Sequence, residues 1–132
     1  MSNPHIPMGD SRDPIRKSRI NELFEELMPD CYRDAEILVK NPITEKVAGQ
    51  LYYAAGSIGA NHGEGYSRAS GKDRARYFEY ALGSVRESMA WYRASVPVLD
   101  PATVGERLDV LEELRRILTA VIPRERDHNL RK

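Results

Sequence analysis

The segment from residue 56 to residue 68 contains four glycines, yet its apolar and polar residues keep the spacing of an α-helix. A glycine in a helix interior lowers stability by about 1 kcal/mol relative to alanine, because it loses more backbone freedom on folding. A helix that keeps several glycines must regain that stability through close approach of another part of the structure. We therefore expect this helix to be packed on more than one side.

At about 100° per residue, this helix has three separate faces. Its small residues form one stripe, at Gly56, Gly59, Ala60 and Gly63. Its polar residues form a second stripe, the polar seam, at Ser57, Asn61, Glu64 and Arg68. Its apolar residues lie opposite the small stripe, at Val47, Leu51, Ala54 and Ile58. The apolar stripe is the expected core face, which leaves the small stripe for a second contact.

Sequence signals for helix starts indicate how many helices the chain forms. Asp13-Pro14, Asn41-Pro42 and Asp100-Pro101 each combine a capping side chain with a proline, which tolerates the first helical position. A weaker capping box lies near Ser70. With the apolar periodicity, these signals predict helices over residues 14–40, 42–66, 73–95 and 101–122. Pro29 is expected to kink or split the first helix.

Short connections favour antiparallel neighbours. The chain is therefore predicted to be all-α, an antiparallel up-down-up-down four-helix bundle over residues 13–123. Residues 1–12 are expected to form a mobile N-terminal arm, and residues 124–132 a charged C-terminal tail.

Charge and cysteine content narrow the possible functions. The 132 residues include 20 basic and 20 acidic side chains, so no overall basic excess favours strong binding to duplex nucleic acid. The single cysteine, Cys31, excludes an internal disulfide and a cysteine-based zinc site. No apolar run approaches the roughly 20 residues of a membrane span, and the N-terminus has no signal-peptide pattern. A cytoplasmic protein without membrane contact is expected.

Several motifs in the middle of the chain resemble those of a known family. They are Ser57-Ile58-Gly59-Ala60-Asn61, Glu64-Gly65-Tyr66 with Arg68, Arg74 with Phe78, and Ala81-Leu82-Gly83-Ser84 with Glu87. Together they resemble the bacterial four-helix-bundle family whose founding members are encoded in intervening sequences of 23S rRNA genes. The resemblance implies a bundle that forms ring-like pentamers. His62 and Gly63 depart from the family pattern, in which position 62 is more often apolar and position 63 more often alanine.

The polar seam has a counterpart at Ser84 and Glu87 on the next helix. In an antiparallel pair these residues could approach Asn61 and Glu64. One interpretation is a site with two carboxylates, and the other is a polar network that sets helix register or a subunit contact. We favour the second, and predict no catalytic residue. The only Glu-x-x-His pair is Glu125–His128, so neither a di-iron centre nor another metal or cofactor is expected.

The tyrosines suggest a surface that contacts another protein chain. Seven tyrosines stand against two phenylalanines, and tyrosine is enriched at interfaces. We therefore expect homo-oligomerisation through the small stripe and the neighbouring tyrosine, at Tyr52, Gly56, Gly59, Ala60 and Gly63. The number of subunits, five, is implied by the family resemblance alone.

The densest basic patch lies between the second and third predicted helices, at Arg68, Lys72, Arg74 and Arg76. The simplest interpretation is solvated charge, because acidic residues are interleaved with the basic ones. The alternative is a nucleic-acid contact. One branch of the resembled family, the accessory proteins of diversity-generating retroelements, binds a reverse transcriptase and nucleic acid.

These features favour a non-enzymatic, self-assembling scaffold or adaptor protein. The alternative is a nucleic-acid-binding accessory protein that acts with an RNA or a reverse transcriptase. An enzyme that uses Glu64 and Glu87 is a third hypothesis.

Overall fold

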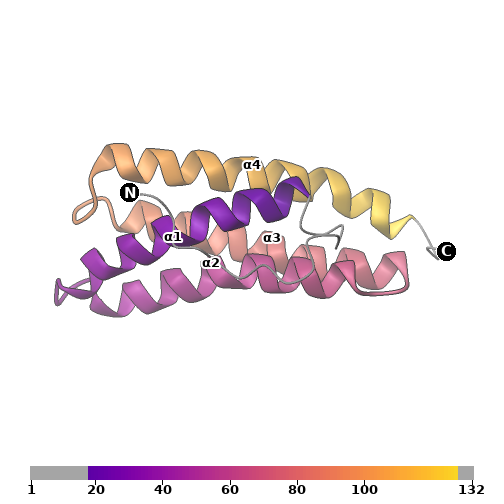
Figure 1. Ribbon diagram of the computed structural model, residues 1–132, viewed down its shortest axis with the longest axis horizontal. Helices are drawn as coiled ribbons and strands as arrows, with labels where there is room; N and C mark the ends of the chain where they lie inside the picture. The colour runs from indigo at the N-terminus through magenta and orange to yellow at the C-terminus, as the bar shows by residue number, and fades with distance from the viewer. Residues whose placement is uncertain (1–17, 128–132) are drawn as a thin grey trace.

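Four α-helices make up the computed structural model, which describes residues 18–127 (Figure 1). They are α1 (Arg19–Val39), α2 (Glu45–Tyr66), α3 (Gly71–Ala94) and α4 (Pro101–Arg126). Consecutive helices run in opposite directions and pack against each other, whereas α1 and α4 contact each other far less. The predicted all-α, antiparallel four-helix bundle is confirmed. The arm expected at residues 1–12 lies outside the described residues.

Helix α1 begins at Arg19, five residues later than predicted, because Ser18 caps its first turn. The Ser18 backbone is extended, and its Oγ accepts a hydrogen bond from the Asn21 amide at 3.1 Å. The capping signal at Asp13-Pro14 lies outside the described residues. Helix α1 then continues through Pro29 to Val39, so the proline does not split it.

Helix α2 also begins later than predicted, at Glu45 instead of Pro42. The Asn41 side chain accepts a hydrogen bond from the Ile43 amide at 2.9 Å, which closes a turn ahead of the helix. Thr44, the residue before the helix, is buried and donates its hydroxyl to the Leu38 carbonyl at 2.7 Å. This hydrogen bond joins the turn to the end of α1, so the residues after Asn41 do not enter α2 at once.

The starts of the last two helices lie closer to the predicted ones. Ser70 Oγ accepts from the Asp73 amide at 3.1 Å, and α3 begins at Gly71. Helix α4 begins at Pro101 as predicted but continues past Pro123 to Arg126, because its last turn is anchored to α3. The boundary expected between residues 123 and 124 therefore lies inside α4. Residues 128–132 of the expected tail lie outside the described part of the chain.

All four helices contribute to one apolar core. Fully buried members include Leu27, Ile58, Val85 and Leu114, one from each helix. Within residues 18–127, no helix has an apolar stretch long enough to cross a membrane.

Helix α2 is packed on two sides at positions where it has no side chain. A Cβ atom placed on Gly59 would lie 2.5 Å from the Phe24 ring of α1. A Cβ atom on Gly65 would lie 2.8 Å from the Phe78 ring of α3. Both distances are shorter than side-chain carbon atoms tolerate. The close approach expected from the glycine content therefore occurs between helices of one chain at these two positions.

Replacing Gly59 by alanine should destabilise the protein, although alanine is the better helix former. The added methyl group would overlap the Phe24 ring, and overpacking of this kind costs about 1–3 kcal/mol. Gly83→Ala is the matched control, because a Cβ atom there would meet no atom within 4 Å. It should stabilise the protein by up to about 1 kcal/mol. Urea unfolding measures both changes, and equal stabilisation by the two would show that Phe24 does not restrict residue 59.

Candidate functional site

Most of the polar seam forms short-range contacts within single helices, and Arg68 reaches α3 by donating to the Tyr77 hydroxyl at 3.1 Å. Ser57 Oγ donates to the Tyr53 carbonyl at 3.0 Å, and Asn61 Nδ2 donates to the Ser57 carbonyl at 3.0 Å. On α3, Ser84 Oγ donates to the Tyr80 carbonyl at 3.2 Å. Each of these side chains donates a hydrogen bond to the backbone carbonyl one turn earlier in its own helix. None of these three hydrogen bonds joins α2 to α3.

Glu64 and Glu87 do not come together as a site. Glu64 lies 2.8 Å from Arg68, and Glu87 accepts a hydrogen bond from Trp91 Nε1 at 3.2 Å. The contact between Gly65 and Phe78 sets the register of the antiparallel pair. That register places Glu87 about eight residues, or about 12 Å, beyond the point of α3 that faces Glu64. The hypothesis that these two carboxylates work together is therefore wrong.

The small stripe is partly covered by α1. Phe24 occupies the space beside Gly59, and Met28 Cε lies 3.9 Å from the Cβ position of Gly56. Ala60 is exposed and Gly63 is half-buried. The prediction that another subunit explains the absence of a side chain at Gly59 is wrong, because the Phe24 ring of the same chain explains it.

The predicted basic patch is not a single surface. Arg74 is buried, with 3% of the residue exposed, and its Nε pairs with Glu125 of α4. The guanidinium carbon of Arg68 lies 4.7 Å from the Tyr77 ring centroid, and that of Arg76 lies 5.4 Å from it. Lys72 is exposed. The prediction that Arg74 shares a binding surface with the other three residues is wrong, because Arg74 is buried against Glu125, 51 residues away in sequence.

A buried polar cluster, which has no counterpart among the predicted site residues, joins α1, α3 and α4. Asp34 Oδ2 accepts hydrogen bonds from the Tyr92 hydroxyl at 2.6 Å and from Arg107 Nε at 2.8 Å. Arg107 also lies 3.5 Å from Asp30. Asp34 is 2% exposed and Tyr92 is fully buried. The signal available in the sequence is the spacing of Asp34 from Cys31 and Leu38, which places a charged residue on the apolar face of α1.

Burial keeps the Tyr92 phenol of the cluster and the thiol of the adjacent Cys31 protonated. Burial raises the pKa of Cys31 to about 11. Burial, together with the nearby Cys31 and Asp34, raises the pKa of Tyr92 far above its usual range. Burial opposes the charged form of Arg107, but its hydrogen bond to Asp34 and the charge of that carboxylate raise its pKa overall. The cluster therefore works as an ion pair that holds α1 to α4, and the Cys31 thiol beside it is a poor nucleophile.

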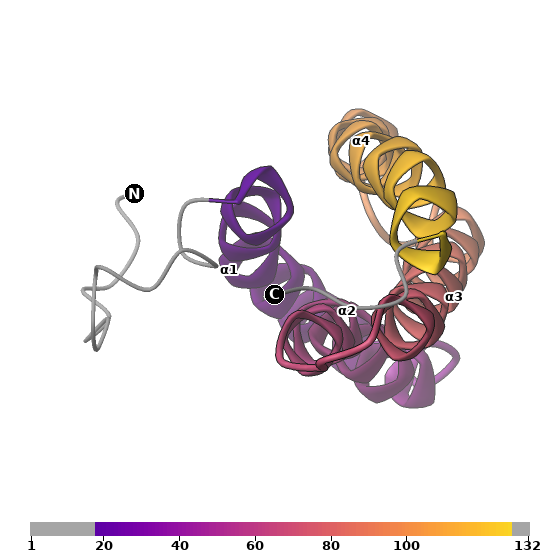
Figure 2. The ribbon, with the colours of Figure 1, turned by 90° about the vertical axis from the view of Figure 1, so that its right-hand side faces the viewer.

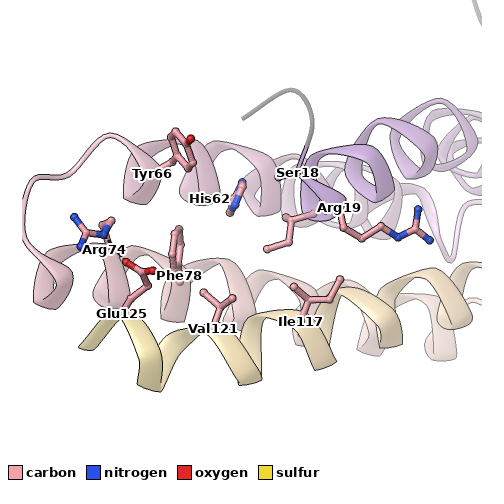
Figure 3. Close-up of a pocket in the computed structure, with 10 residues that line it drawn as sticks. Ser18, Arg19, His62, Tyr66, Arg74, Phe78, Ile117, Val121 and Glu125 are labelled. Carbon is pink, nitrogen blue, oxygen red and sulfur yellow. Dashed lines mark hydrogen bonds and ion pairs between the residues drawn. The ribbon is translucent and has the colours of Figure 1, made fainter. Parts of the chain in front are cut away.

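A cleft of about 410 Å³ lies at the end of the bundle where α1 begins (Figure 3). Arg19, the first residue of α1, lies 2.8 Å from Glu113. Helix α4 runs 13 residues beyond Glu113 to Arg126, which is about 20 Å without α1 beside it. Figure 2 shows α1 and α4 standing apart at this end of the molecule. The cleft exists because α1 begins too late to cover the far ends of the other three helices.

His62 forms part of the wall of this cleft. The residue is 5% exposed, and its ring stacks on Phe78 with 5.3 Å between ring centroids. Burial lowers the pKa of His62, so the imidazole is neutral near pH 7. Among the described residues, no three His, Cys, Asp or Glu side chains are grouped so that they could bind a metal ion.

Replacing Asp34 by alanine should strongly destabilise the protein. The change would leave the buried Tyr92 hydroxyl and the half-buried Arg107 guanidinium without their main acceptor, and breaking a buried pair costs about 3–5 kcal/mol. We expect the lower end of that range, because Asp30 stays near Arg107. Glu22→Ala is the control, since it removes an exposed pair with Arg19 and should change stability by about 0.5 kcal/mol or less. Urea unfolding compares the two, and an equally small effect of both would contradict the role given to the cluster.

The chain matches a known family over most of its length. The family model described as 23S rRNA-intervening sequence protein matches residues 17–120. Among solved structures, the chain resembles a protein of unknown function from the S23 ribosomal protein family of Bacteroides thetaiotaomicron VPI-5482, determined at 1.70 Å resolution. The TM-score is 0.72 at 18% identity, over 78% of this chain and 97% of that one, which shows a shared fold. No curated protein matches the chain.

Proposed function

The chain belongs to the 23S rRNA-intervening sequence protein family, and from this premise we propose that it is a non-catalytic scaffold or adaptor that assembles with copies of itself. One observation carries the proposal, an exposed groove of about 250 Å³ between α1 and α2. This α1–α2 groove is lined by Tyr32, Ala35, Glu36, Val39, Ala48, Gly49 and Tyr52. Five of its seven lining residues are aromatic or aliphatic, or six with glycine counted.

The groove presents large apolar side chains that the fold of one chain leaves uncovered. Tyr32, Val39 and Tyr52 are 54%, 49% and 41% exposed. The rings of the two tyrosines meet edge to face, with 5.8 Å between their centroids. A tyrosine can bury its ring in an interface while its hydroxyl keeps a hydrogen bond, and contiguous exposed apolar residues often mark a contact site. These properties favour a protein partner for the groove.

Gly49 leaves room for a close approach at the same place. It lies within α2, and a Cβ atom on it would meet no atom within 4 Å. Gly59 and Gly65 are explained by rings of the same chain, but the fold of a single chain gives no such reason for Gly49. A partner that packs closely against α2 would supply one. Stability lost by a helical glycine would then be regained in the assembly.

A second copy of the chain is the partner we propose for the groove. The family resemblance implies ring-like assembly, and a closed ring forms when each subunit offers one surface to a different surface of the next. The α1–α2 groove would be one of those two surfaces. Five subunits is the number that the resemblance implies.

Replacing both Tyr32 and Tyr52 by serine should weaken self-association, with at least a tenfold higher dissociation constant, because tyrosine is enriched among the few interface residues whose truncation removes about 2 kcal/mol or more of binding energy. Tyr80→Ser is the control, since Tyr80 is 52% exposed and lies outside the groove. Light scattering at micromolar protein measures all three masses. The wild type and the control should have the same oligomeric mass, and the double variant a smaller one.

Two outcomes of this experiment would contradict the proposal. A monomeric wild type at micromolar concentration would exclude self-assembly as its function. An oligomer that the double variant retains would exclude the α1–α2 groove as the contact. Circular dichroism of the variants checks that each remains helical.

Nucleic-acid binding is the alternative function, and the burial of Arg74 weighs against it. The basic residues left near the α2–α3 turn are Arg68, Lys72 and Arg76. Arg68 lies 2.8 Å from Glu64, and Arg76 lies 3.7 Å from Asp73. A surface with few unpaired cations releases few counterions from a nucleic acid, so it binds weakly.

Titration of fluorescent single-stranded RNA or duplex DNA with the oligomer should therefore give no change in anisotropy at about 50 mM salt. The decisive double variant combines Lys72→Gln and Arg76→Gln. Its control, at the other end of the bundle, combines Lys40→Gln and Lys46→Gln. Saturable binding that falls steeply by about 200 mM salt, and that only the first double variant removes, would establish the alternative.

A further inference from the structure

The cleft at the open end of the bundle has the size and walls of a ligand site, and self-assembly through the α1–α2 groove makes no use of it. Its volume of about 410 Å³ is within the range of about 300–1,000 Å³ that is typical of small-molecule pockets. Ile117 and Val121 of α4 remain half-buried there, because α1 does not reach them. With Phe78 of α3, they give the cleft apolar walls.

One end of the cleft holds a buried hydrogen-bond donor that lacks an acceptor. The Arg74 side chain is 4% exposed, and its Nη1 donates to the carbonyls of Arg68 and Ala69 at 3.0 and 2.8 Å. Its Nε pairs with Glu125. Its Nη2 is buried and makes no hydrogen bond. A buried donor without an acceptor is costly, so an acceptor that reached it would be bound favourably.

The charges around the cleft select a neutral acceptor over an anion. Glu125 already balances the charge of Arg74, and Figure 3 shows the two side chains together at one end of the cleft. At the other end, Arg19 pairs with Glu113. An anionic ligand that approached Arg74 would meet the carboxylate of Glu125 as well. A ketone, ester or amide oxygen would accept a hydrogen bond from the unpaired Arg74 Nη2 without that repulsion.

We propose that this cleft is a binding site for a small neutral molecule with an apolar body and a carbonyl oxygen. The apolar body lies between Phe78, Ile117 and Val121. The carbonyl oxygen accepts a hydrogen bond from Arg74 Nη2. His62, stacked on Phe78, closes the α2 side of the site.

Acetophenone is a suitable probe, because it joins one aromatic ring to one ketone. Titrated into ¹⁵N-labelled full-length protein, it should cause saturable shifts of the amide signals of Phe78, Ile117 and Val121. Benzoate, an anion of similar size, should bind more weakly. Val121→Phe fills the cleft and should weaken acetophenone binding at least fivefold, whereas Val110→Phe, on the same helix outside the cleft, should leave it unchanged.

The role of Arg74 is tested by comparing acetophenone with ethylbenzene, which lacks the carbonyl oxygen. Arg74→Lys keeps the charge beside Glu125 but removes the Nη2 donor. It should weaken acetophenone binding about tenfold, as expected for a hydrogen bond to a charged group, and leave ethylbenzene binding unchanged. The amide spectrum of Arg74→Lys reports whether that variant is folded.

Each opposite result would overturn the assignment. Absence of saturable shifts at the cleft residues, or equal binding to Val121→Phe and the wild type, would exclude the site. Tighter binding of benzoate than of acetophenone would exclude a neutral ligand. Equal weakening of both probes by Arg74→Lys would exclude the hydrogen bond. If that variant does not fold, the benzoate and Val121→Phe comparisons still decide whether the cleft binds neutral molecules.

Discussion

Helix α2 approaches its neighbours where it has no side chain, and the rest of the arrangement follows from these two contacts. Gly59 admits the Phe24 ring of α1, and Gly65 admits the Phe78 ring of α3. The second contact sets the register of α2 against α3, which separates the polar groups of the two helices. It also places Phe78 where His62 stacks on it, so the same contact builds one wall of the cleft. Larger residues at these positions would hold the three helices further apart.

The helices could be predicted from the sequence because apolar periodicity and capping residues are local signals. Two of their starts could not, because several capping signals compete within a few residues. Ser18 begins α1 although Asp13-Pro14 offers a similar signal. Thr44 donates its hydroxyl to Leu38, and this contact forms only once the chain has turned back on itself. Local propensity predicts that a helix forms, and contacts between helices decide where it begins.

The candidate site was harder to predict because its pairings cross long sequence separations. Arg74 and Glu125 are 51 residues apart, and Asp34 and Arg107 are 73 apart. When its partner is not known, Arg74 is interpreted as part of a basic patch. Asp34 alone shows only that a charged residue lies on an apolar helix face. From the sequence, the serine and asparagine side chains of α2 and α3 are predicted to form one shared hydrogen-bond network. In the fold these side chains instead donate hydrogen bonds within their own helices, because the backbone carbonyl one turn earlier is always within reach.

The late start of α1 also affects how the protein unfolds in part. Helices α2, α3 and α4 each pack closely on a sequence neighbour, so most contacts are short in sequence, which is typical of fast-folding proteins. Helix α1 rests mainly on α2, and its firm connection to α4 is the Asp34–Arg107 pair near its C-terminal end. Its first turns are held to α4 through the exposed Arg19–Glu113 pair and to α2 through the Phe24 ring beside Gly59, so their separation would also uncover Ile20 and Leu23. Hydrogen exchange of the α1 backbone amides should therefore require a partial unfolding step in which α1 separates as a unit, while the contacts among α2, α3 and α4 remain.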